Sequence, residues 1–151
     1  MNHLAVLVTL CLCCLFGCNP APSSNLPVTR MTIGDRDYTL EIAAEPVHRQ
    51  IGLMRRDSMP ARHGMIFVFP DEQERHFWMK DTKIPLDILF LDGEGNVISI
   101  KQMRPHVGTA SSDGPARYAI ELNMGQAKDC GVKVGDRLTV PEAVRQLKPE
   151  R

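Results

Sequence analysis

Residues 76–92 read HFWMKDTKIPLDILFLD, a stretch that joins two strand-like runs through a short, charged loop. The first run ends at Met79 and contains Trp78, the only tryptophan of the chain. The second run begins at Leu86 and places the carboxylate of Asp87 within an otherwise apolar sequence. An alternating strand followed by a nearly all-apolar strand indicates a β-rich fold. The loop between the two strands is where we expect a functional site.

Comparable runs lie on both sides of this stretch, separated by turns rich in Gly and Pro. Residues 28–34 and 38–43 predict a hairpin, and 65–69 predict a strand buried on both faces because the run has no polar gap. Further strands are expected at 97–103, 117–123 and 134–140. Many short strands at regular spacing predict a mainly β fold, a compact jelly-roll-like β-sandwich or a partly closed barrel.

One short helix is expected within this fold, over residues 45–56. Val47, Ile51 and Met54 recur at helical spacing there, which predicts one apolar face packed against the core. The segment 104–116 is the longest irregular stretch of the chain. Because long loops in compact domains often serve function, we expect this one to cover a site.

The N-terminus has the pattern of an export signal. Residues 4–16 form an apolar run of signal-peptide length, too short to cross a bilayer well. The run leads into Leu15-Phe16-Gly17-Cys18, which resembles the lipobox of bacterial lipoproteins. In that class of signal the cysteine is lipidated and cleavage occurs before it. The resemblance therefore implies a signal peptide at 1–17 and a lipid anchor on Cys18.

The remaining chain divides by composition. Residues 18–27 are a tether rich in Pro and Ser, 28–141 form a single β-rich domain, and 142–151 are a charged tail that we expect to fray. This order predicts an exported cell-envelope lipoprotein on the periplasmic face, held to the membrane through its lipid. Asn19 favours the outer membrane where the source has one. Cys130 is the only cysteine within 28–141, so the domain depends on its core rather than on disulfides.

Charge and motifs exclude several classes of function. The chain has 18 Lys and Arg against 18 Asp and Glu, a net charge of zero, whereas nucleic-acid binding requires a basic face. We therefore expect no nucleic-acid partner. The histidines outside the leader lack metal-ligand spacing, and no phosphate-binding Gly loop or nucleophile elbow is present. We predict neither a metal site nor a cofactor.

Several sequence blocks, in order and at characteristic spacing, resemble the family catalogued as domain of unknown function 192. These blocks are Gly52-Leu53-Met54-Arg55, Gly64-Met65-Ile66-Phe67, Phe77-Trp78-Met79-Lys80-Asp81-Thr82, Ile84 to Phe90, Arg117 to Gly125, and Val134-Gly135-Asp136. The resemblance covers about Met31 to Val140. It implies a small, mainly β domain, close to a jelly-roll-like sandwich and often exported, with no settled activity.

The candidate site combines an aromatic side chain, cations and carboxylates. An ionised carboxylate on an apolar strand face is costly unless it is paired, which makes Asp87 and Glu121 informative. Each allows two interpretations: a structural tie or ion pair, with Arg117 as a candidate partner of Glu121, or a group in a ligand pocket. The leading hypothesis is a cleft that binds a small polar or carbohydrate-like ligand. Its candidate residues are Arg55, Trp78, Lys80, Thr82, Asp87 and Glu121.

Two other classes of function remain open. An envelope enzyme would use Asp87 and Glu121 as acid and base, which requires the two carboxyl groups to face each other across one cleft. A non-catalytic envelope interaction module would instead present an exposed apolar patch without a cleft.

Overall fold

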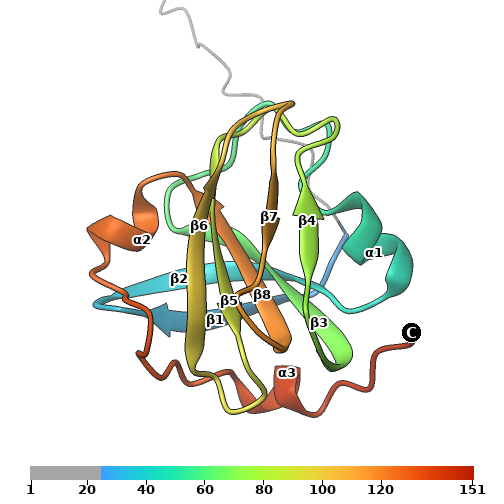
Figure 1. The fold of residues 1–151 in the computed structure, drawn as a ribbon, viewed down its shortest axis with the longest axis vertical. Helices are drawn as coiled ribbons and strands as arrows, with labels where there is room; N and C mark the ends of the chain where they lie inside the picture. Colours follow the sequence, from blue (N-terminus) through green and yellow to red (C-terminus); the bar gives the residue numbers. More distant parts are fainter. Residues whose placement is uncertain (1–24) are drawn as a thin grey trace, which may run out of the picture.

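The computed structural model describes residues 25–151, so the predicted signal peptide, the lipid anchor on Cys18 and most of the predicted tether lie outside the described residues. Figure 1 shows the fold. Its strands are β1 (Val28–Ile33), β2 (Arg36–Ala43), β3 (His63–Gln73), β4 (His76–Trp78), β5 (Leu86–Leu91), β6 (Val97–Met103), β7 (Thr109–Ser111) and β8 (Ala116–Asn123). Its helices are α1 (Pro46–Ile51), α2 (Gln126–Asp129) and α3 (Glu142–Arg145).

Six strands form one mixed sheet in the order β1-β2-β3-β8-β5-β6, and β4 pairs with β7 in a separate two-stranded sheet. The hairpin β1-β2 is antiparallel, as the sequence predicts, whereas β2 and β3 run parallel with α1 in the connection between them. The order begins at β1 and ends at β6, so the strands in the described part of the chain do not close into a barrel. The predicted mainly β, sandwich-like fold is confirmed.

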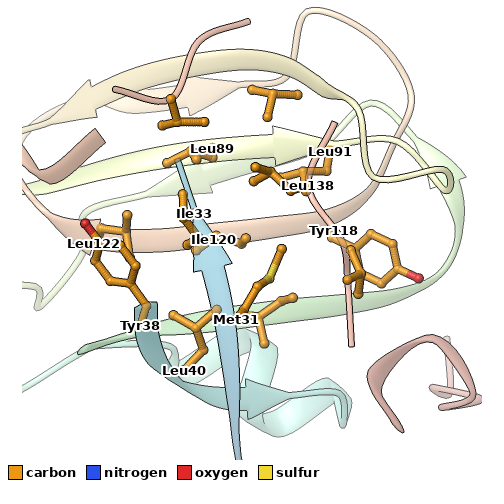
Figure 2. Close-up of a cluster of buried hydrophobic side chains, with 14 of the residues drawn as sticks. Met31, Ile33, Tyr38, Leu40, Leu89, Leu91, Tyr118, Ile120, Leu122 and Leu138 are labelled. Carbon is orange, nitrogen blue, oxygen red and sulfur yellow. The ribbon is translucent and has the colours of Figure 1, made fainter. Parts of the chain in front are cut away.

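The large sheet is buried on both faces. On one face, alternate residues of β1, β2, β5 and β8 form a core that includes Ile33, Leu40, Leu89 and Ile120, and Figure 2 shows these side chains meeting, with Leu138 of the C-terminal segment among them. The other face carries a second core, which includes Phe67, Phe90 and Met79. Because both faces of β5 are covered, all six of its residues are buried.

The helix predicted over 45–56 is shorter, and its predicted apolar face is wrong. α1 ends at Ile51, because Gly52 takes a positive φ of 49° and stops the helical path. Val47 and Ile51 are exposed rather than packed. A side chain at Gly52 would reach within 3.3 Å of the Phe67 ring on β3, so the chain turns where the backbone passes close to that strand.

The C-terminal part also departs from the predictions. Residues 134–140 contribute only an isolated bridge, Asn96 with Arg137, in place of the expected last strand. After Pro141, where a fraying tail was expected, α3 forms and its Val144 is completely buried in the core beneath the large sheet. Val144, with Leu147 packed against the same core, therefore holds a segment half of whose residues are charged.

Candidate functional site

The two predicted carboxylates lie on opposite faces of the large sheet. In the register between β5 and β8, Asp87 stands opposite Leu122 and Glu121 stands opposite Ile88. Leu122 belongs to the core shown in Figure 2, whereas Ile88 belongs to the core on the other face. Because paired residues share a face, the sheet separates the two carboxyl groups. The hypothesis that Asp87 and Glu121 act as an acid–base pair across one cleft is therefore wrong.

Asp87 is a structural tie. Its side chain is buried, and each carboxylate oxygen accepts one hydrogen bond: Oδ1 from Nε2 of Gln102 at 3.1 Å and Oδ2 from the backbone N–H of Ala127 at 2.9 Å. These bonds fasten the first residues of α2 to β5 and β6. The structural interpretation of Asp87 is the one that its contacts support, because such bonds offset the cost of burying a charge.

Glu121 has a different environment. It is 5% exposed, and no hydrogen bond from the described residues reaches its carboxyl group. Burial raises the pKa of Glu121 from 4.5 to about 8, and the charge of Arg56 offsets this only in part. Arg56 is itself engaged, since its two terminal nitrogens donate to the carboxylate of Glu41 at 2.6 and 2.8 Å. The neighbouring cation is thus Arg56 from the segment after α1, and not the expected Arg117.

A small cavity opens beside the Glu121 carboxyl group. Its volume is about 30 Å³, enough for one small polar group or about two water molecules. Its lining includes Gly52, Phe67, Trp78, Thr82 and Glu121. The cavity therefore lies where α1 and the segment after it meet β3, β4, β8 and the loop that follows β4.

Phe77 positions Trp78 at this cavity. On the inner face of β4, the Phe77 ring packs edge-to-face against Phe67, with centroids 4.9 Å apart, and against Phe90 at 5.6 Å. Alternation along the strand then turns Trp78 outward, where 53% of its surface is exposed. Nζ of Lys80 lies 5.4 Å from the centroid of the Trp78 ring, so an ammonium group already occupies one side of the aromatic surface.

Two backbone segments are joined at the edge of the cavity. The N–H of Arg55 donates to the carbonyl oxygen of Asp81 at 2.8 Å, and both residues have positive φ angles, 62° and 53°. Thr82, which is buried, donates through its hydroxyl to the carbonyl oxygen of Lys80 at 3.2 Å. These contacts hold the charged loop of residues 80–85 against the segment that follows α1. Positive φ angles at residues other than glycine cluster at functional sites in proteins.

Three of the six predicted site residues line the cavity, and Asp87 lies on the opposite face of the sheet. Trp78, Thr82 and Glu121 line the cavity, and the segments that carry Arg55 and Lys80 meet beside it. Alternation within β5 and β8 is visible in the sequence, but their mutual register, which sets the two carboxylates apart, is not.

The predicted cover of the site is only partly related to it. Within 104–116, residues 109–111 form β7, which pairs with β4 in place of an irregular loop. The N–H of His106 donates to the carbonyl oxygen of Thr82 at 3.3 Å, so the segment supports the loop of the site. None of its residues lines the cavity, as far as residues 25–151 are concerned.

Further features limit the chemistry. In the described part of the chain, no three His, Cys, Asp or Glu side chains stand close enough to hold a metal ion. None of the helices between residues 25 and 151 has the length and apolar character needed to cross a membrane. What the cavity offers is one buried carboxyl group, one hydroxyl group and an aromatic surface at its mouth.

Comparison with known proteins adds a family and two solved structures. The model of domain of unknown function 192, described as "Uncharacterized ACR", matches residues 29–140. A structure described as a candidate transcription regulator from Sinorhizobium meliloti is 38% identical, with a TM-score of 0.68, covering 73% of this chain and 89% of that one. A protein of unknown function from Novosphingobium aromaticivorans is 29% identical, with a TM-score of 0.67, covering 79% and 89%. No curated protein matches the chain.

Proposed function

The chain belongs to the family of domain of unknown function 192, and on that premise we propose that it is a binding domain for a small polar, carbohydrate-like ligand. The site is the cavity lined by Trp78, Thr82 and Glu121, with Arg55 and Lys80 beside it. Asp87, on the opposite face of the sheet, has no part in it.

The observation that carries the proposal is the state of Glu121. A carboxyl group buried without a hydrogen bond costs stability, on the order of 1–3 kcal/mol or more. Here the group faces an open cavity, so a ligand that enters can make the missing bond. The exposed ring of Trp78 beside the same cavity offers the flat apolar surface on which sugar rings pack.

Export and anchoring form a separate part of the proposal. The leader pattern at 1–17 and the lipobox-like sequence that ends at Cys18 support a lipoprotein held at the periplasmic face of the envelope, with the outer membrane favoured. In cells fed a labelled fatty acid, the full chain should carry the label, and Cys18→Ser should not. Label on the Cys18→Ser variant would contradict this anchor.

One structural neighbour is described as a candidate transcription regulator, but the charge of this chain does not favour DNA binding. This chain has a net charge of zero, whereas a surface that binds duplex DNA needs clustered Lys and Arg. A lipid-anchored domain outside the cytoplasm would also have no access to the chromosome.

Calorimetric titration of the full chain with neutral, acidic and amino monosaccharides tests the proposed binding. We expect at least one sugar to bind, and Trp78→Ala to weaken that sugar by tenfold or more. Val134→Ala, a change at another exposed apolar side chain, should have no effect. Asp87→Asn should also leave the affinity unchanged. Binding that survives Trp78→Ala, or that depends on Asp87, would place the site elsewhere.

A further inference from the structure

We propose that the ligand carries an acidic group, a carboxylate or a phosphate, which enters the cavity and accepts a hydrogen bond from Glu121 while Arg55 and Lys80 supply the opposing charge. This inference rests on the proposed function and specifies the chemical class of the ligand.

The size of the cavity restricts what can enter it. A volume of about 30 Å³ admits one small polar group and excludes a sugar ring. The ring must therefore lie outside, against Trp78, while one substituent reaches Glu121. A ligand of this shape has a flat body and a short polar arm.

The charges around the cavity favour an anion. Arg55 and Lys80 are both exposed, and neither forms an ion pair in the described part of the chain. Lys83 in the same loop is paired with Asp57 at 2.7 Å, and Arg56 is paired with Glu41, so these two cations are already balanced. The unbalanced groups beside the cavity are positive, apart from the exposed Asp81, whose carbonyl oxygen holds Arg55. Such an arrangement attracts anions and repels ammonium groups.

The protonated carboxyl group of Glu121 also favours an acidic ligand. Because burial keeps this carboxyl group neutral at neutral pH, it has an O–H to donate and no charge with which to repel an acid. An acidic arm could not approach an ionised carboxylate in this position. Above about pH 8 the same side chain becomes ionised, and an acidic ligand should then be expelled.

Other ionisable groups face Glu121 from the elements packed around it. Arg49 of α1 lines the cavity, but its guanidinium donates to the carbonyl oxygens of residues 44, 68 and 150. Along the same face of the sheet, Glu41 and Lys101 are each two strands away, paired with Arg56 and Asp113 respectively. Glu41 and Lys101 are thus held in ion pairs and Arg49 by backbone carbonyl oxygens, whereas the carboxyl group of Glu121 has no partner among the described residues.

The test uses three sugars that differ in one substituent: D-glucose, D-glucuronate and D-glucosamine. Fluorescence of the single Trp78 in the full chain reports their binding. We expect glucuronate to bind at least tenfold more tightly than glucose at about pH 7, and to weaken about tenfold by about pH 9, as Glu121 ionises. Glu121→Gln should remove this pH dependence, since the amide cannot ionise.

Charge variants provide a second readout. Arg55→Ala and Lys80→Ala should each weaken glucuronate relative to glucose, by severalfold, whereas Lys133→Ala on the Asp87 side should not. Equal affinities for glucose and glucuronate, or tighter binding of glucosamine with affinity that rises with pH, would overturn the acidic class and leave the binding site in place. Failure of all three sugars to change Trp78 fluorescence, with calorimetry also silent, would overturn the proposed function itself.

Discussion

Replacing Glu121 with Gln should remove a dependence of stability on pH that the native domain carries. The pKa of this carboxyl group is about 4.5 in the unfolded chain and about 8 in the folded one. Between these values the folded state holds a proton that the unfolded state releases, so the free energy of unfolding falls as pH rises. The contribution of Glu121 to the free energy of unfolding is fully present below about pH 4.5 and is lost by about pH 8 and above. Gln fills the same space without ionising.

The size of the effect follows from the same two pKa values. One pKa unit corresponds to about 1.4 kcal/mol, so the contribution of Glu121 changes by about 4 kcal/mol between about pH 5 and about pH 9. For a domain of this size, with a urea m-value of about 1–3 kcal/mol/M, the unfolding midpoint of the native protein should fall by about 2 M relative to the Gln variant.

Urea unfolding followed by far-UV circular dichroism measures this difference at several pH values. Other titrating groups act on both proteins alike and cancel in the comparison. Glu74→Gln, which changes an exposed glutamate, should follow the native protein. If the native and Glu121→Gln midpoints move in parallel between about pH 5 and about pH 9, the carboxyl group is not buried as described, and the reasoning fails.

Three further substitutions test the framework of the domain. Asp87→Asn should destabilise the domain by about 1–3 kcal/mol, because an amide has one accepting oxygen and cannot accept from both the Ala127 N–H and Nε2 of Gln102 as the carboxylate does, and hydrogen exchange should show α2 opening first. Gly64→Ala should cost several kcal/mol in urea unfolding, because its added carbon would lie 2.4 Å from a backbone oxygen of β8. Val144→Ala should cost about 2 kcal/mol, since α3 belongs to the core; an unchanged midpoint would show that the segment is dispensable.

Local patterns accounted for much of the fold. Strands such as β5 and the hairpin β1-β2 are predictable because their apolar periodicity and turns lie within a few residues of sequence. The parallel pairing of β2 with β3, and the pairing of β4 with β7, join segments far apart in the chain, and no local pattern encodes them. The burial of Val144 likewise depends on contacts with core residues from distant strands, which no local pattern around residue 144 encodes.

The site shows the same division. Trp78 and the charged loop were recognisable because a lone aromatic residue and a charge cluster interrupt strand patterns. The sequence also drew attention to both buried carboxylates, Asp87 and Glu121. Only the register of β5 against β8 assigns Asp87 to a structural bond and leaves Glu121 facing a cavity. A property of one strand can be seen in sequence, whereas a relation between strands requires the assembled sheet.

The location of the binding site is the central claim, and a two-dimensional ¹H–¹⁵N spectrum of the full chain, titrated with D-glucuronate, tests it most directly. The single indole N–H of Trp78 gives one resolved signal. We predict that this signal, and the backbone amides of residues 52–55 and 119–122, shift together and saturate. Shifts confined to residues 127–133, around Asp87, would contradict the claim, as would a saturating titration that leaves the indole signal unmoved.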